Sequence, residues 1–436
     1  MIKKIVSILV MVVLSLAIVT VAKEYKSTLV NLNSGENAED SNEDLSENVV
    51  IWYSYGYYEE YLEKVAENYE AIYNVKVTLK YVDGSNMLEA IAEANETGEG
   101  IPDLYIAGSE HLEKAYLMGI CKKNTSDKFT SENFLANGLE AATYKDSLYA
   151  YPLGFETGIF VYNTKYVTNV PKSFDDIKKF ADNFNSIGGD ELTEDEIDNG
   201  ETPTESDTVD YSIVESILVW DADSMLYNYG FIGNYISFEG NYSDKNYKVV
   251  VDEEKITSSI NYYKELYNYF ALANEADNYS KIVSDFAEDK IVFSIMNIES
   301  LRELDKSGVD YGVCPLPVLS NDLGICQLAL TDLVFVNPYS NKTDKAEAFA
   351  IYLTNSATYS MYDSIGLLPA KKLKLYENFA LKSVAEGFDN SCALPSTLLS
   401  PSYWSDVEDL FRTVNESEEL DGIMEAFIDK LNSYIK

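Results

Sequence analysis

The chain has 436 residues, 46% of them hydrophobic, which is enough for two or three units that each bury a core. Its 73 acidic and 33 basic residues give a formal net charge of −40 at pH 7, which excludes nucleic-acid binding, because that function needs basic patches against phosphates. With His111 as the single histidine, a histidine-based metal site and a Ser-His-Asp triad are poorly supported, so we expect no metal ion and no cofactor.

The N-terminal segment has the pattern of an export signal. Lys3 and Lys4 precede residues 5–22, a mostly apolar run that would be about 27 Å long as a helix. The lysines predict that the N-terminus stays in the cytoplasm and that the rest of the chain is exported to the extracellular face of the membrane. Residues 1–22 are therefore predicted to be a signal peptide or a retained N-terminal anchor, with the anchor slightly favoured. No cysteine follows the run, so we expect no lipid attached there.

Residues 23–48 are polar and acidic and show no apolar periodicity, which predicts a disordered linker. The apolar run 49–53 predicts the first strand. A helix is predicted to follow it, because apolar side chains recur with helical spacing on one face, at Tyr58, Leu62, Val65 and Tyr69.

Strands and helices then alternate, which is the pattern of a parallel sheet with helical crossovers. The predicted strands are 75–81 and 101–107, and the predicted helices are 87–94 and 112–119. Ligands bind at the carboxyl ends of the strands in such sheets. This rule places Tyr55, Tyr57 and the loop that contains Glu110 at the rim of a cleft.

The stretch 151–166 carries the first candidate ligand-binding residue. Pro152 favours an extended chain, Gly154 permits a bend, and residues 158–162 are typical of a buried strand. Glu156 stands between the bend and the strand, and a carboxylate there is costly unless it is paired or faces a wet cleft. We interpret Glu156 as a cleft residue, with a surface salt bridge as the alternative.

Further along the chain, Ser173 and Asp176 form the pattern of a capping box, which predicts that a helix begins there. Residues 188–210 are acidic and lack the spacing of a calcium loop, so we predict a solvated loop. The apolar run 211–220 is followed by Asp221, another candidate for the cleft.

Several segments, in this order, resemble the extracellular solute-binding proteins of ABC importers, the family that includes maltodextrin-binding proteins. The resemblance covers roughly residues 48–436. The segments that carry it are Ile101–Ala107, Tyr151–Asn163, Pro171–Asp176, Phe286–Ile295, Tyr311–Pro317, Leu333–Asn337, Lys345–Thr354 and Gly366–Ala370. One departure is Glu299, which stands where many members of the family have a tryptophan.

This resemblance implies an α/β fold of the two-lobe periplasmic-binding-protein type (type II-like). Each lobe is expected to be a mostly parallel sheet flanked by helices, with a ligand cleft between the lobes that closes by hinge motion. Residues 49–155 with 330–367 are assigned to lobe 1, and residues 156–329 with 368–436 to lobe 2.

The resemblance also implies a binding protein and not an enzyme. It predicts a monomer that captures a carbohydrate, such as a maltooligosaccharide, and delivers it to ABC permease subunits that work with a cytoplasmic ATPase. Carboxylates would accept hydrogen bonds from sugar hydroxyls, and aromatic rings would stack on sugar faces. The candidate acceptors are Glu156 and Glu110, the candidate platforms are Trp404, Tyr55 and Tyr57, and the further candidates are Asp221 and Glu299.

Two alternative functions remain open at this point. The carboxylates at Glu110, Glu156, Asp221 and Glu299 also suit a cation such as a polyamine, through ion pairs and cation–π contacts. A secreted glycosidase with paired carboxylates is a weaker hypothesis, because the order of segments does not give a (β/α)₈ barrel.

The four cysteines show no C-x-x-C spacing, which gives no support to a zinc or thioredoxin-like site. Two interpretations remain for Cys314 and Cys326: a disulfide that closes a small loop, or buried free thiols.

Overall fold

The computed structural model describes residues 48–189, 211–241, 244–245, 247–272, 278–319, 323–376 and 378–434. The predicted N-terminal segment, nearly all of the predicted linker and residues 190–210 of the acidic insertion lie outside the described residues. The chain divides into a small unit that includes Ala66–Val77 and a large unit of Val49–Val65 with Thr78–Lys436. In the small unit, residues 66–73 form the C-terminal half of α2 (Glu59–Tyr73). Among the described helices, none has both the length and the apolar character that a membrane span requires.

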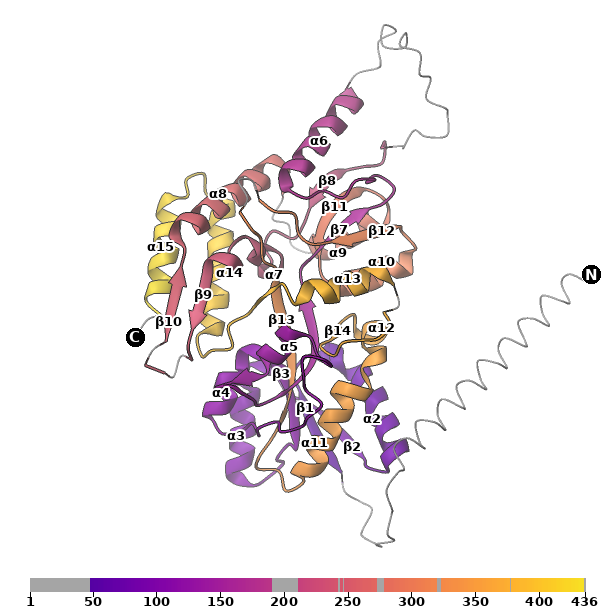
Figure 1. Cartoon of the computed structure of the whole chain (residues 1–436), viewed down its shortest axis with the longest axis vertical. Coiled ribbons are helices and arrows are strands. Elements are labelled where there is room, and N and C mark those ends of the chain that lie inside the picture. Colours follow the sequence, from indigo (N-terminus) through magenta and orange to yellow (C-terminus); the bar gives the residue numbers. More distant parts are fainter. Residues whose placement is uncertain are drawn as a thin grey trace, which may run out of the picture. The chain divides into compact units, whose positions relative to one another are not determined.

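Within the described residues, the larger sheet has seven strands in the order β14-β6-β13-β3-β1-β2, with β15 paired to β13 (Figure 1). The strands are β1 (Val49–Tyr53), β2 (Val77–Tyr81), β3 (Leu104–Gly108), β6 (Tyr151–Thr157), β13 (Leu328–Val336), β14 (Leu368–Pro369) and β15 (Cys392–Ala393). β1 and β3 are parallel, as expected, but β13 is antiparallel to both β3 and β6. The sheet is therefore mixed and not mostly parallel, because β13, β14 and β15 run in the direction opposite to β1, β3 and β6.

Helices and short turns follow the strands of this sheet. They are η1 (Gly56–Tyr58), η2 (Gly84–Asn86), α3 (Met87–Thr97), η3 (Ser109–His111), α4 (Leu112–Leu117), α5 (Ala136–Ala141), the hairpin β4 (Thr143–Tyr144) and β5 (Ser147–Leu148), α11 (Thr343–Ile351), the π-helical turn η8 (Tyr352–Ser356), η9 (Thr358–Ser360) and α12 (Met361–Ile365). Trp52, Ile91, Leu112 and Phe335 belong to one buried cluster. Trp52 is 3% exposed and therefore lies in the core.

The smaller sheet has four strands in the order β12-β7-β11-β8. They are β7 (Ile159–Asn163), β8 (Ser216–Val219), β11 (Ile291–Met296) and β12 (Tyr311–Cys314). β7 is antiparallel to β11 and β12, whereas β8 is parallel to β11. This sheet is mixed as well.

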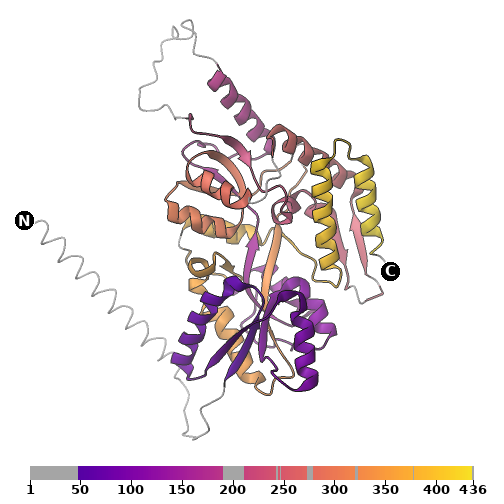
Figure 2. The same cartoon turned by 180° about the vertical axis from the view of Figure 1, so that it is seen from behind.

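The second half of the chain adds helices and one further strand pair: α6 (Phe174–Gly189), α7 (Met225–Asn228), η5 (Tyr229–Phe231), η6 (Gly233–Tyr235), β9 (Ile236–Glu239) with β10 (Lys248–Val251), α8 (Glu253–Tyr269), α9 (Asn278–Ala287), α10 (Ile298–Ser307), α13 (Phe379–Phe388), α14 (Ser400–Glu416) and α15 (Asp421–Asn432). Figure 2 shows α14 and α15 beside the β9–β10 pair. Trp220, Tyr263 and Phe411 belong to the large aromatic core of this region.

The predicted capping box at the start of α6 is confirmed. The N–H of Ser173 donates to Oδ2 of Asp176, and the N–H of Asp176 donates to Oγ of Ser173, at 3.1 and 3.2 Å. These reciprocal bonds satisfy two backbone donors that the first helical turn leaves free.

The strands β6 and β13 pair with each other within the larger sheet. In Figure 1, β13 extends from this sheet toward the smaller one. Six of the seven residues of β6 are buried, and Glu156 is the exception. Gly154 pairs with Asp332, and the register of the pair shifts between Asp332 and Leu333. Such an irregularity can re-aim a side chain beside a functional site.

The structure overturns both interpretations for Cys326, which forms a disulfide with a third cysteine, whereas Cys314 is a free thiol. Cys326 is bonded to Cys392, not to Cys314, with 5.7 Å between the two Cα atoms. The parallel pairing of β15 with β13 sets Cys392 opposite Leu328, two residues after Cys326. The partner lies 66 residues away in sequence, so sequence spacing alone favoured the wrong pair. Cys121 and Cys314 are free thiols.

Candidate functional site

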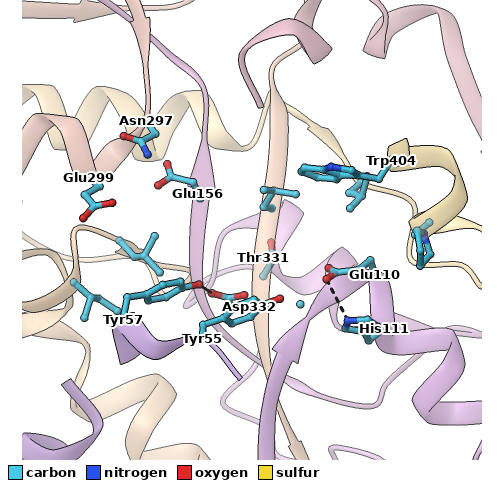
Figure 3. Close-up of a pocket in the computed structure, with 17 residues that line it drawn as sticks. Tyr55, Tyr57, Glu110, His111, Glu156, Asn297, Glu299, Thr331, Asp332 and Trp404 are labelled. Carbon is cyan, nitrogen blue, oxygen red and sulfur yellow. Dashed lines mark hydrogen bonds and ion pairs between the residues drawn. The ribbon is translucent and has the colours of Figure 1, made fainter. Parts of the chain in front are cut away.

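The candidate site is a cavity of about 620 Å³ in the large unit, within the usual size range for small-molecule pockets. Figure 3 shows the side chains that line it. They come from the ends of strands, from the crossing strands and from α14, and are Tyr55, Tyr57, Gly108, Glu110, His111, Glu156, Asn297, Glu299, Leu330, Thr331, Asp332, Ile365, Leu367, Leu394, Ser400, Pro401 and Trp404.

Glu156, on β6, is already hydrogen-bonded without a ligand. Its Oε1 accepts from the N–H of Thr157 and from the N–H of Ile298, both at 2.9 Å. Ile298 is the first residue of α10, so the carboxyl group caps the positive end of that helix. Burial nevertheless raises the pKa of Glu156 to about 8, although the two amides lower it. The group is therefore mainly protonated at neutral pH and can donate a hydrogen bond to a ligand.

Asp332, on β13, is the second carboxyl group held by the protein. Its Oδ2 accepts from the hydroxyl groups of Tyr58 at 2.8 Å and Tyr57 at 3.0 Å. Burial raises its pKa to about 6, and the two tyrosines oppose that shift. The ring of Tyr57 also stacks on Tyr55, with centroids 5.5 Å apart and planes 8° apart. The two rings give the pocket a flat aromatic surface.

Glu110 follows β3 and is folded back over it. The carboxyl group of Glu110 occupies the space that a Cβ atom at Gly108 would take. Nε2 of His111 lies 3.5 Å from Oε1 of Glu110. Burial raises the pKa of Glu110, although a hydrogen bond from Tyr55 lowers it. Burial lowers the pKa of His111, so its imidazole is mainly neutral at pH 7.

Glu299 lies in the first turn of α10 and is paired with Arg302 at 3.3 Å. Arg302 also donates to the carbonyl of Ser364 at 2.9 Å. Gly366 packs against the same turn in the left-handed conformation, and a Cβ there would lie 2.8 Å from Cα of Glu299. The glycine of the predicted 366–370 motif therefore lets α12 end close against the pocket.

Trp404 forms the other side of the pocket, across from Glu156, Asn297 and Glu299 in Figure 3. It lies inside α14. Its Nε1 donates to Glu408 at 2.6 Å, and the ring is only partly buried. Its neighbour Tyr403 is fully buried in the core. Trp404 thus keeps a ring face available to a ligand.

Six of the seven predicted ligand-binding side chains line this pocket: Tyr55, Tyr57, Glu110, Glu156, Glu299 and Trp404. Their contact with a ligand remains a prediction. Asp221 is not among the lining residues; its Oδ1 accepts from the N–H of Asp223 at 3.2 Å in a turn after β8. Asp221 lies two residues after the end of β8 (Ser216–Val219), and its contact with a ligand also remains a prediction.

The sequence interpretation missed Asp332, Thr331 and Asn297, which also line the pocket. Asp332 had a usable signal, because it is a single carboxylate within an apolar strand, which is the argument that identified Glu156. Asn297 caps α10 by accepting from the N–H of Ser300 at 2.9 Å, so its position between a strand and a helix was also informative.

The pocket combines three properties: aromatic surfaces, four carboxyl groups, and no lysine or arginine among its lining residues. Within the described part of the chain, no group of three or more His, Cys, Asp or Glu side chains is placed to hold a metal ion. Such a lining suits a neutral, hydroxyl-rich ligand with flat faces, because carboxyl groups bond to hydroxyl groups and rings stack on apolar faces.

Comparison with known proteins agrees with these features. A family model described as "bacterial extracellular solute-binding protein" matches residues 64–373. The maltodextrin-binding protein MdxE of Bacillus subtilis (strain 168) is 22% identical over 368 residues, which cover 81% of this chain and 82% of that protein. A maltooligosaccharide ABC transporter solute-binding lipoprotein of Streptococcus pneumoniae (strain ATCC BAA-255 / R6) is 22% identical over 371 residues, 81% of this chain and 80% of that protein.

Among solved structures, a cyclo/maltodextrin-binding protein complexed with maltotetraose superposes with a TM-score of 0.68 at 15% identity. The superposition covers 91% of this chain and 99% of that protein. This likeness confirms the predicted two-lobe α/β binding-protein fold.

Proposed function

The chain belongs to the family of bacterial extracellular solute-binding proteins, and we propose that it captures a carbohydrate, such as a maltooligosaccharide, for an ABC importer. The observation that carries the proposal is the pocket lining, in which Tyr55, Tyr57 and Trp404 occur with four carboxyl groups and without lysine or arginine. The two related proteins described above, which bind maltodextrin or maltooligosaccharides, support the same ligand class.

The aromatic residues supply contact area at low entropic cost. Tyr55 and Tyr57 are stacked with nearly parallel planes, so a sugar ring finds a flat aromatic face that is already formed. Trp404 is fixed by its bond to Glu408. Preorganised rings lose little rotamer freedom when a ligand binds, and this increases affinity.

The protonation of Glu156 and the burial of Asp332 favour a sugar over a polyamine. Burial raises the pKa of Glu156 to about 8 and that of Asp332 to about 6. A cation would need these groups ionised in an environment that disfavours their charge, whereas a neutral carboxyl group both donates to and accepts from sugar hydroxyls. Glu299, an acidic candidate for a cation, is already paired with Arg302.

The remaining parts of the proposal follow from the family. We propose that the protein is a monomer without enzymatic activity, exported to the extracellular face of the membrane through its N-terminal segment, which is either cleaved or kept as an anchor. Its partners would be ABC permease subunits. The family consists of solute-binding proteins, which gives no support to the glycosidase alternative.

Isothermal titration calorimetry of the purified full chain with maltotetraose, cellotetraose, glucose and spermidine tests the ligand class. We expect heat of binding with one oligosaccharide series, and a melting temperature that rises with the same ligand. A ligand at about 100 times its Kd adds roughly 2.7 kcal/mol to the free energy of unfolding. Binding of spermidine alone would replace the proposal with the polyamine hypothesis, and hydrolysis of an aryl glycoside that Glu156→Gln abolishes would show an enzyme.

A further inference from the structure

The segment from Cys392 to Ser400, called the strap below, forms part of the pocket wall. It begins with β15 and reaches α14 only at its last residue. Leu394 and Ser400 of the strap line the pocket and are 3% and 1% exposed. The strap leads directly into α14, which carries Trp404. The position of the strap therefore decides where this wall of the pocket stands.

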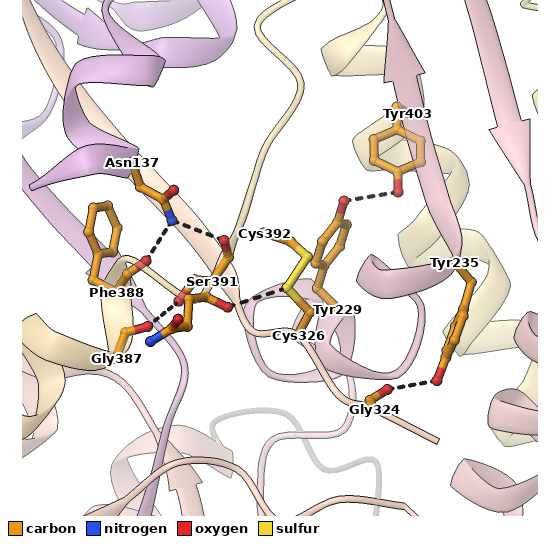
Figure 4. Close-up of a disulfide and its surroundings, with 11 residues drawn as sticks. Asn137, Tyr229, Tyr235, Gly324, Cys326, Gly387, Phe388, Ser391, Cys392 and Tyr403 are labelled. Carbon is orange, nitrogen blue, oxygen red and sulfur yellow. Dashed lines mark hydrogen bonds between the residues drawn. A yellow bond between two sulfur atoms is a disulfide. The ribbon is translucent and has the colours of Figure 1, made fainter. Parts of the chain in front are cut away.

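The first end of the strap is held by the disulfide between Cys326 and Cys392 (Figure 4). Around it, the N–H of Cys392 donates to the carbonyl of Gln327 at 2.8 Å, and the N–H of Leu394 donates to the carbonyl of Ala329 at 3.2 Å. These bonds fix the strap to the start of β13, the strand that carries Asp332.

Just before the strap, the chain is held by a buried amide. Nδ2 of Asn137, on α5, donates to the carbonyl of Phe388 at 2.5 Å and to that of Ser391 at 2.9 Å (Figure 4). Asn137 is 8% exposed, so these bonds form in a nearly dry setting and are costly to leave unmade.

The second end of the strap is held by a carboxyl group that the pocket does not use. Glu113, on α4, is fully buried. Its Oε2 accepts from the N–H of Leu398 at 2.9 Å, and its Oε1 accepts from the hydroxyl of Tyr144 at 3.0 Å. A carboxyl group is costly to bury, so its contact with the strap backbone indicates a positioning role.

We propose that the disulfide and Glu113 are positioning groups for the ligand pocket: together they fix the strap, and the strap sets Leu394, Ser400 and Trp404 at the distance that the ligand requires. Neither group touches the ligand. This inference rests on the proposed function, because the affinity it concerns is that for an oligosaccharide.

Glu113→Gln tests the second end in the full chain. Glutamine keeps one acceptor oxygen but presents an amino group in place of the other, so it cannot accept from both Tyr144 and Leu398. We expect the Kd for maltotetraose, measured by calorimetry, to rise about tenfold. The matched control is Tyr144→Phe, which removes a bond to the same carboxyl group on the side away from the strap; we expect a rise of less than about threefold.

The double variant Cys326→Ser, Cys392→Ser tests the first end, with Cys121→Ser, Cys314→Ser as the control that also loses two sulfurs. Hydrogen exchange followed by mass spectrometry, without ligand, should show faster exchange in residues 392–404 of the first variant and of Glu113→Gln, but not in the control. If the disulfide variant does not fold, Glu113→Gln alone decides.

Wild-type affinity in a folded Glu113→Gln protein would overturn the proposal, as would unchanged exchange in the strap of both variants. If the wild-type chain binds none of the saccharides, the proposed function fails while the exchange comparison still stands. Unchanged hydrogen exchange in the variants would then show that neither group holds the strap. Faster exchange would show that both groups position the strap, whatever ligand the pocket binds.

Discussion

The two walls of the pocket are built in different ways. The strand wall carries Glu156 on β6 and Asp332 on β13, and each carboxyl group already accepts two hydrogen bonds from the protein. The strap wall carries Leu394, Ser400 and Trp404, which come from a segment held by a disulfide and a buried glutamate. The strand wall thus supplies preorganised polar groups, and the strap wall supplies mainly contact area.

This difference suggests how affinity and selectivity are divided. Polar groups that are fixed before binding discriminate between ligands, because a ligand that does not match them leaves a buried group unpaired. A tryptophan ring on a helix contributes area to any flat ligand. We therefore expect substitutions in the strap wall to reduce ligand affinity most. We expect substitutions in the strand wall to change how the stability of the protein depends on pH.

The largest effect is expected from Trp404→Ala, which removes the main surface of the strap wall. A central aromatic residue of this kind commonly contributes enough that its loss weakens binding about a hundredfold, or about 2.7 kcal/mol. Calorimetry with maltotetraose at pH 7 measures the change, and Trp404→Phe, which keeps a flat ring, should lose much less. Affinity within threefold of wild type would show that the ring only packs against its helix.

The sequence predicted the strand wall better than the strap wall, for a physical reason. Glu156 was recognisable because a carboxylate in an apolar strand needs a local explanation, and Asp332 fits the same rule. The strap depends on partners far away in sequence, such as Cys326 with Cys392 and Glu113 with Leu398. No local pattern encodes those pairs, and the wrong disulfide partner for Cys326 was the result.

The fold followed from local patterns in the same way. The capping box at Ser173 and the buried strand at 159–163 were predicted because their signals lie within a few residues. The direction of β13 was not, because antiparallel pairing with β3 and β6 depends on how the whole chain crosses between the sheets. The place of Asp221 outside the pocket lining was not predicted for a similar reason, because it depends on the turn after β8; its contact with a ligand remains a prediction.

The second prediction concerns the strand wall and pH. Because burial raises the pKa of Glu156 from 4.5 to about 8, the folded state binds a proton that the unfolded state has lost between these values. The free energy of unfolding should therefore fall as pH rises through this window. Glu156→Gln mimics the neutral form, so we expect it to match wild type at pH 4 and to be more stable at pH 9, by on the order of 2 kcal/mol.

Urea denaturation of both proteins from pH 4 to pH 9 measures this difference. Burial also raises the pKa of Asp332, to about 6, so Asp332 makes the free energy of unfolding fall with pH in both proteins. This contribution cancels when the two proteins are compared. Parallel curves for wild type and Glu156→Gln would mean that Glu156 is ionised in the folded protein. The strand wall would then present a charge to the ligand, and the polyamine hypothesis would gain support.

A smaller effect is expected from Tyr57→Phe, which removes one of the two hydroxyl groups bonded to Asp332. That bond favours the ionised carboxylate, so its loss should raise the pKa of Asp332 further. The rise should be only about half a unit, because Tyr57 is 48% exposed and water can replace part of the bond. Carbon-13 NMR titration of the aspartate carboxyl groups measures the shift. Tyr55→Phe is the matched control, because Tyr55 bonds to Glu110 instead; equal shifts in both variants would contradict the assignment.

The smallest effect is expected from Cys314→Ala. This substitution tests whether Cys314 is free and takes no part in holding the strap. Cys314 lies on β12, and burial raises the pKa of its thiol to about 12, so it is unreactive at neutral pH. We expect the free energy of unfolding to change by less than about 1 kcal/mol and the affinity for maltotetraose to stay at the wild-type value. Titration of thiols in denaturant without reductant should count two in wild type and one in the variant, because Cys121 alone then remains free. Three thiols in the variant would mean that Cys314 is bonded to one of the other cysteines, and the strap would lose the anchor on which the contrast between the two walls depends.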